Sequence, residues 1–168
     1  MARLSVVGAK NAGKTTLIER LLPALRGHDL RVNSIKHTAH NHAFDTPGKD
    51  SHRHRSAGAE QTLTISSSEL ALFGKRDTGL LTEIEDLLER RSDLCLVEGD
   101  KHSDLPKILL TRALDGIDIN KIKNIVATYG SEPTEQALPH FLTDDIDGLA
   151  AFIIETWSPA TSKERADA

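Results

Sequence analysis

The feature that most constrains this chain is a glycine-rich segment near its start, residues 8–15, with the sequence GAKNAGKT. It fits the pattern G-x-x-x-x-G-K-[ST], in which backbone N–H groups surround a polyphosphate. The mostly apolar residues 4–7 (LSVV) come directly before it and predict a short buried strand. Apolar residues then recur at helical spacing over 17–25 and predict a helix. A strand, a glycine-rich turn and a helix in this order distinguish a phosphate-binding loop from a surface turn. The segment therefore predicts binding of a nucleoside triphosphate.

Each part of this loop has an expected task. The glycines allow the backbone to wrap the phosphates, and the start of the following helix adds a partial positive charge. Lys14 is expected to reach the β- and γ-phosphates, and the Thr15 hydroxyl is expected to ligate Mg²⁺. The predicted nucleotide-binding residues are Gly8, Asn11, Ala12, Gly13, Lys14, Thr15 and Thr16.

Length and composition narrow the class of protein. The 168 residues predict one domain over 1–157, since domains typically hold roughly 100–200 residues. Residues 158–168 are small, polar and charged, and we expect a disordered tail. The formal charge of −4 argues against a general electrostatic grip on nucleic acid. The only cysteine, Cys95, lies in an apolar run and is expected to be reduced and buried.

A cytoplasmic, soluble protein is expected. The first predicted strand begins close to Met1, which leaves no room for a signal peptide. Apolar runs also stay far shorter than the roughly 20 residues that a membrane helix needs.

The order of predicted elements indicates the fold class. Strands are predicted at 30–35, 94–97, 107–111 and 124–128, a short extended piece at 138–142, and a hairpin at 62–65 and 70–73. Helices are predicted at 51–59, at 79–90, and from Asp144 or Asp145 to Trp157. Alternating strands and helices predict an α/β chain with a three-layer P-loop NTPase fold, a mixed but mainly parallel sheet and a β-hairpin extension.

Charged residues follow two of the predicted strands. Glu98 comes directly after the fully apolar run 94–97, and Lys36 with His37 follows the second strand. Ligands collect at the carboxyl ends of strands in open α/β sheets. A carboxylate at such a position typically holds Mg²⁺ directly or through water. The longer reach of Glu leaves open whether Glu98 binds the metal or orients the attacking water, and the alternative is a structural surface carboxylate.

A second group of charged residues lies in the loop at 47–51, with the sequence PGKDS. Gly48 allows unusual backbone angles, Lys49 is able to pair with phosphate, and Asp50 is able to take a metal or a proton. Arg53 and Arg55 follow. The residues alone leave open a plain solvated loop whose Asp50 or Ser51 caps a helix.

A histidine-rich stretch raises a different function. Five histidines lie within residues 37–54: His37, His40, His42, His52 and His54. Imidazole is a common ligand of Ni²⁺ and Zn²⁺, although no cysteine joins the group and the spacing fits no closed zinc pattern. The alternative hypothesis is therefore a nickel or zinc metallochaperone GTPase that uses this loop.

Four stretches together resemble one known family, the molybdopterin-guanine dinucleotide biosynthesis protein B (MobB) family. They are residues 8–16, then 35–38 (IKHT) with His40, then 47–51 (PGKDS) leading into 55–59 (RSAGA), and 97–99 (VEG) with Lys101 and 106–108 (PKI). The resemblance runs to about residue 112 and more loosely to 157. Asp100 departs from it, because the family more often carries an aromatic or apolar residue there.

The resemblance implies a function and a set of site residues. It implies GTP binding, slow GTP hydrolysis, a homodimer built partly by sheet pairing, and action beside the guanylyltransferase that joins GMP to molybdopterin. GTP and Mg²⁺ are the implied cofactors. With the strand-end argument, it gives Glu98 and Asp50 as catalytic residues and Thr15, Glu98 and Asp50 as metal ligands. The residues expected to contact a second anionic ligand, molybdopterin phosphate or the nucleotide, are Lys36, His37, His40, Lys49 and Arg55.

Two features of nucleotide enzymes are missing from the sequence. The segment 120–123 (NKIK) lacks the final Asp with which many GTPases read guanine, so it does not reveal the base. We also find no glutamine placed to aim a water and no dedicated arginine finger, which predicts slow turnover unless a partner supplies the missing group. A small-molecule kinase is a third hypothesis, weakened because no arginine-rich lid is evident.

Overall fold

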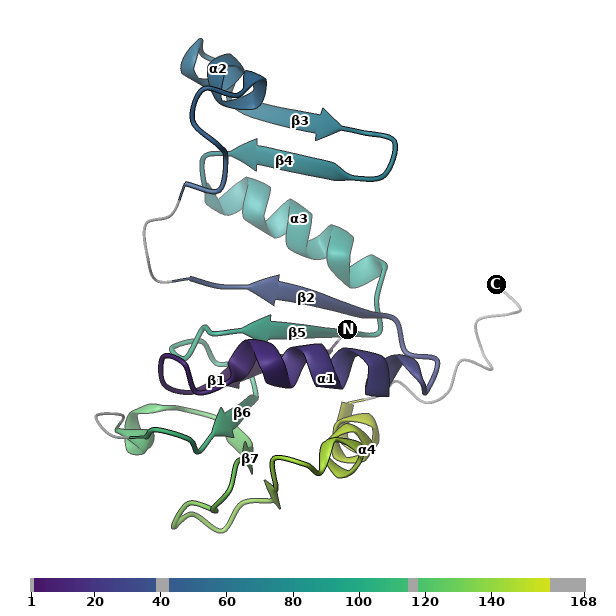
Figure 1. Ribbon diagram of the computed structural model, residues 1–168, viewed down its shortest axis with the longest axis vertical. Helices are drawn as coiled ribbons and strands as arrows, with labels where there is room; N and C mark the ends of the chain where they lie inside the picture. The colour runs from purple at the N-terminus through teal and green to yellow at the C-terminus, as the bar shows by residue number, and fades with distance from the viewer. Residues whose placement is uncertain (1, 39–42, 115–117, 158–168) are drawn as a thin grey trace. The chain divides into compact units, whose positions relative to one another are not determined.

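The computed structural model describes residues 2–38, 43–114 and 118–157, and the chain divides into two compact units (Figure 1). One unit contains Met1–His37 and Leu87–Ala168, and we call it the sheet unit. The other contains Thr38–Asp86, and we call it the hairpin unit. The prediction that 1–157 behaves as a single domain stays a prediction.

The sheet unit is built on six parallel strands. They are β1 (Ala2–Val7), β2 (Val32–Lys36), β5 (Leu94–Glu98), β6 (Lys107–Leu110), β7 (Ile125–Tyr129) and β8 (His140–Phe141). Their order across the sheet is β2-β5-β1-β6-β7-β8, and each neighbouring pair runs parallel. The central strands are apolar almost throughout because both of their faces are buried.

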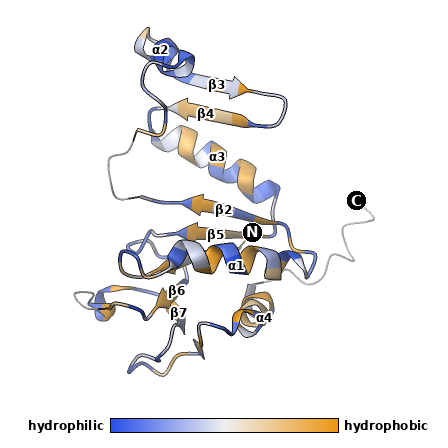
Figure 2. Ribbon diagram, in the orientation of Figure 1, coloured by the Kyte–Doolittle hydropathy of each residue, from blue (hydrophilic) through white to orange (hydrophobic). Residues whose placement is uncertain are grey.

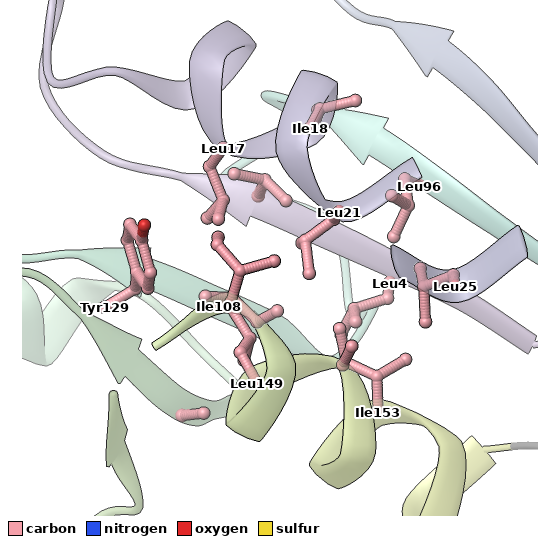
Figure 3. Close-up of a cluster of buried hydrophobic side chains, with 14 of the residues drawn as sticks. Leu4, Leu17, Ile18, Leu21, Leu25, Leu96, Ile108, Tyr129, Leu149 and Ile153 are labelled. Carbon is pink, nitrogen blue, oxygen red and sulfur yellow. The ribbon is translucent and has the colours of Figure 1, made fainter. Parts of the chain in front are cut away.

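Two helices cover one face of this sheet. Helix α1 (Lys14–Arg26) and helix α4 (Ile146–Trp157) place their leucine and isoleucine side chains on those of the strands beneath (Figure 3). Leu21 of α1 and Leu149 of α4 are fully buried in this cluster. Of the two predicted caps of α4, Asp145 is the one that acts, since its carboxylate accepts from the Gly148 N–H at 3.0 Å.

The opposite face of the sheet is also closed. Ser5, Cys95 and Leu109 are fully buried there. The Lys107 side chain, equally buried, donates to the backbone carbonyls of Ser103 and Leu105 at 2.6 and 2.7 Å, so the β5–β6 connection covers part of this face. Burial lowers the pKa of Lys107 below that of an ordinary lysine.

A buried carboxylate organises the start of the hairpin unit. This unit contains α2 (Asp50–Ser56), β3 (Gln61–Ile65) and β4 (Leu70–Gly74), and α3 (Thr78–Arg90) begins in it. Asp45 accepts a hydrogen bond from the Ser51 hydroxyl at 2.7 Å and two from the Arg55 guanidinium at 2.5 and 3.2 Å. Arg55 also lies 5.8 Å from the ring centre of Phe73 on β4. The two contacts fix α2 on the loop before it and on the hairpin after it.

One face of the hairpin carries an exposed apolar ladder. Leu63 lies opposite Leu72 and Ile65 lies opposite Leu70, so the four side chains share one face of the antiparallel pair. Their exposed fractions are 53%, 40%, 72% and 73%. Figure 2 colours most of β4 as hydrophobic. Within the hairpin unit, this face is not part of a core.

The predicted α/β fold with a mainly parallel sheet is confirmed, and the structure refines it. The antiparallel pair, expected to make the sheet mixed, forms a separate two-stranded sheet. The helix predicted at 51–59 ends at Ser56, because Gly58 turns the chain with a φ of 116°. A short 3-10 helix, Ile119–Lys121, was not predicted. The expected tail at 158–168 lies outside the described residues.

Candidate functional site

The glycine-rich loop lies at the carboxyl end of β1 and rests on β6. A Cβ atom at Gly8 would lie 3.0 Å from the Leu110 Cβ and 3.3 Å from the Leu110 carbonyl oxygen, so any larger residue would press on β6. Gly13 precedes α1 with a φ of 100°, a left-handed conformation that glycine adopts without strain. The two glycines that the motif requires are thus explained by the backbone path.

The start of α1 is suited to hold an anion. Its first turn contains no acidic residue, and among the described residues no side chain caps it. The first N–H groups of a helix have no partner within the helix and carry a partial positive charge. A phosphate group placed there satisfies these donors.

Lys14 lies back across the loop that precedes it. Its ammonium donates to the Gly8 carbonyl at 3.2 Å and to the Ala9 carbonyl at 2.5 Å. An ammonium has three donors, so one remains for a further acceptor. Burial lowers the pKa of Lys14 and Lys36 lowers it further, against the opposing effect of Glu98. The contacts with the loop hold Lys14 close to the place where its motif binds phosphate.

Three predicted site residues meet beside the loop. The Thr15 hydroxyl lies 3.0 and 3.1 Å from the two carboxylate oxygens of Glu98, to which it donates. The Lys36 ammonium lies 3.1 Å from Glu98 Oε1. Lys36 and Glu98 are register partners on β2 and β5, and Glu98 is also the partner of Val6 on β1. Parallel register therefore brings the three strand ends to one level.

The chain just after Glu98 passes very close to His37. The Glu98 carbonyl accepts from the His37 N–H at 2.9 Å, and the Gly99 N–H donates to the Val6 carbonyl at 3.0 Å. A Cβ atom on Gly99 would lie 2.7 Å from the His37 carbonyl oxygen. Glycine after Glu98 is thus required for the strand ends to meet, while the His37 side chain is exposed.

The remaining predicted residues belong to the hairpin unit or lie outside the described residues. Lys49 and Asp50 are exposed at the start of α2, and Asp50 pairs with Arg53 at 3.6 Å. Arg55 is held by Asp45, as described above. His40 and His42 fall in the range 39–42, outside the described residues. The parts assigned to Lys49, Asp50, Arg55 and His40 in the site stay predictions.

The hairpin unit contains a cavity that was not predicted. Its volume is about 590 Å³, and His52, Arg55, Glu60, Lys75 and Asp77 contribute to its lining. Both signs of charge face it, as in sites that bind polar ligands. Asp45, which orients Arg55, was also missed, because an aspartate in a polar loop is indistinguishable in sequence from a turn residue.

The described residues provide no metal site of the kind that a metallochaperone needs. Within 2–38, 43–114 and 118–157, no group of three or more His, Cys, Asp or Glu side chains is arranged to hold a metal ion. In the same part of the chain, no helix has the length and apolar character required to cross a membrane.

Sequence comparisons show which known proteins this chain is similar to. The sequence profile of MobB, described as molybdopterin guanine dinucleotide synthesis protein B, matches residues 3–129. The chain is 34% identical over 159 residues to the molybdopterin-guanine dinucleotide biosynthesis adapter protein of Escherichia coli, covering 90% of this chain and 91% of that protein. The adapter protein of the same name from Haemophilus influenzae is 39% identical over 111 residues, covering 65% of this chain and 62% of that protein.

A solved structure agrees with both sequence matches. The crystal structure of Bacillus subtilis MobB superposes with a TM-score of 0.71 at 30% identity, covering 96% of this chain and all of that one. The range that the family profile matches includes the glycine-rich loop, Lys36 and Glu98. This chain belongs to the MobB family.

Proposed function

We propose that this protein binds GTP with Mg²⁺ at its P-loop and acts as an accessory protein in molybdenum-cofactor maturation. Its partner would be the guanylyltransferase that joins GMP to molybdopterin. The observation that carries the proposal is the cluster of Thr15, Glu98 and Lys36 beside a glycine loop fitted for phosphate. Membership of the MobB family and the names of its relatives supply the pathway.

The donor set of the cluster fits Mg²⁺. A hydroxyl and a carboxylate are the hard oxygen ligands that this ion prefers, and they already lie within hydrogen-bond distance of each other. Thr15 and Glu98 would hold the metal, with Asp50 as a further ligand. Bound there, Mg²⁺ would neutralise the charge of the β- and γ-phosphates.

We propose that hydrolysis is slow. The assigned catalytic residues are Glu98 and Asp50, and Glu98 would serve mainly to hold the metal. The residues that the structure describes around the cluster include no glutamine to orient an attacking water. A partner would then have to supply the missing group for fast turnover.

The second anionic ligand would be molybdopterin phosphate. Lys36, His37, His40, Lys49 and Arg55 are the proposed contacts. Within the hairpin unit, Arg55 and Lys75 line the cavity together with the carboxylates of Glu60 and Asp77.

A cytoplasmic homodimer completes the proposal. The apolar ladder of the hairpin supports it, because exposed contiguous apolar surface marks interaction sites. Directly opposed aliphatic pairs such as Leu63 and Leu72 would pack on the same ladder of a second copy.

Isothermal titration with GTP and with ATP, both in Mg²⁺, tests the nucleotide. We expect tighter binding of GTP, and tighter binding of ATP would contradict the proposal. A pull-down with the tagged protein from native extract, followed by identification of a nucleotidyltransferase, tests the pathway. Absence of any such enzyme from repeated pull-downs would count against it.

Lys14→Ala should weaken GTP binding roughly 100-fold, because it removes a charge-assisted contact to the phosphates. The same titration measures this loss. Lys121→Ala is the matched control, since Lys121 lies exposed in the 3-10 helix before β7 and pairs with Asp118. Full affinity in Lys14→Ala would overturn the phosphate assignment.

A further inference from the structure

Glu98 is satisfied by two different kinds of donor in the structure. Its Oε1 atom accepts from the Thr15 hydroxyl at 3.0 Å and pairs with the Lys36 ammonium at 3.1 Å. These are the same carboxylate and the same hydroxyl that the proposed metal would use. We infer that Lys36 is a resident cation of the metal position, and that it competes with a divalent ion for Glu98. This inference rests on the proposed Mg²⁺·GTP site.

Two cations at the same carboxylate oxygen would repel each other. Mg²⁺ binds oxygen at about 2.0–2.1 Å, so a metal on Oε1 would lie within about 5 Å of an ammonium paired with the same atom. The metal would also use a lone pair of the Thr15 hydroxyl, which stays available while its proton is donated to Glu98. Metal binding at Oε1 is therefore favoured when Lys36 moves away, whereas Thr15 is able to keep its hydrogen bond.

Exposure decides which partner moves. The Glu98 side chain is 15% exposed, whereas that of Lys36 is 65% exposed. Lys36 lies on β2, the edge strand of the sheet, and its ammonium is carried by a flexible four-carbon chain. The ammonium is therefore able to move into solvent at little cost in free energy. Lys14 is engaged with two loop carbonyls and does not take its place at Glu98. The anion is fixed and its cation is exchangeable.

This arrangement has two opposed consequences for binding. Without a divalent ion, Lys36 neutralises Glu98 and so reduces the repulsion between this carboxylate and an entering triphosphate. With a divalent ion, Lys36 competes for the same oxygens and weakens the metal. Lys36 thus lowers the factor by which Mg²⁺ improves the affinity for the nucleotide. By thermodynamic linkage, the nucleotide improves the affinity for Mg²⁺ by the same factor.

The test measures that factor in the full-length protein. The affinity for a fluorescently labelled GTP is determined with saturating Mg²⁺ and again in EDTA, for the wild type, Lys36→Met and Lys36→Arg. We expect the ratio of the two affinities to rise roughly tenfold in Lys36→Met, the value of one charged contact. Lys36→Arg should restore the wild-type ratio, and the control Lys121→Met should leave it unchanged.

A second readout needs no nucleotide. Mn²⁺ binding, followed by electron paramagnetic resonance, should be tighter in Lys36→Met than in the wild type. Equal losses of GTP affinity with and without Mg²⁺ would make Lys36 a plain phosphate ligand and overturn the inference. An unchanged ratio with unchanged Mn²⁺ affinity would overturn it too. Failure of the wild type to bind GTP at all would instead reject the proposed function.

Discussion

Strands β5 and β4 have similar apolar sequences, but β5 is buried and β4 is largely exposed. The residues LCLV of β5 are all buried, whereas in LALF of β4 both leucines are exposed. The difference lies in their neighbours. β5 has β1 and β2 on its two sides and α1 over one face, whereas β4 pairs only with β3. An apolar composition therefore indicates that a strand is to be buried. The topology decides whether the same unit provides the elements that bury it.

The two units are stabilised by different interactions. The sheet unit satisfies its apolar strands internally and uses their carboxyl ends for the candidate site. The hairpin unit relies on the polar network of Asp45, Ser51 and Arg55 and leaves its aliphatic ladder exposed. Three predictions, from the largest effect to the smallest, test the contrast.

Leucine truncation should distinguish the strands most strongly. Leu96→Ala in β5 removes a fully buried side chain and should lower the free energy of unfolding by about 3 kcal/mol. Leu70→Ala in β4 is the matched variant and should change it by about 0.5 kcal/mol or less in dilute protein. Urea unfolding measures both.

The cost of Leu70→Ala should grow with protein concentration if a second copy covers the ladder, because a dimer is stabilised by mass action. Equal costs for Leu96→Ala and Leu70→Ala at every concentration would remove the contrast.

Glycine substitution should show an intermediate difference. Gly99 and Gly58 both have left-handed backbones, with φ of 94° and 116°, and alanine is strained at each by about 1 kcal/mol. Only at Gly99 would the new Cβ also meet an atom, the His37 carbonyl oxygen at 2.7 Å. We expect Gly99→Ala to cost about 2 kcal/mol, measured by thermal unfolding. Equal losses of stability in Gly99→Ala and Gly58→Ala would show that the chain after β5 is able to move away from His37 without further cost.

Acid should affect the hairpin unit through Asp45. Burial alone would raise the pKa of Asp45, but the donors of Arg55 and Ser51 outweigh it and hold the pKa below the ordinary 3.8. The unfolded chain then takes up the proton first, so this stabilisation is present above about pH 4 and is lost as the pH falls below it.

Protection factors of the α2 and hairpin amides, from hydrogen exchange at pH 5 and at pH 3, measure this loss of stability. Asp45→Asn should abolish the loss, and Asp50→Asn, at an exposed carboxylate, is the control. Protection from exchange, corrected for the intrinsic rate at each pH, that still falls on acidification in Asp45→Asn would contradict the assignment.

Local patterns were sufficient to predict most elements and two parts of the site. The positions of the glycine loop and of Glu98 at strand ends were predicted because each depends on its immediate neighbours, a strand and a turn. The hairpin was found because apolar runs flank a short polar loop. The pairing of Lys36 with Glu98 depends on which strands are adjacent and in which register, and Asp45 depends on burial. Neither is recorded in any short stretch of sequence.

The close approach of Gly8 to Leu110 has a kinetic consequence. The glycine-rich loop rests on the end of β6, so the shape of the loop is largely set before a nucleotide binds. Little chain entropy then remains to be lost on binding, and association should be rapid. Differences in affinity between nucleotides would consequently appear in how long each stays rather than in how quickly it enters.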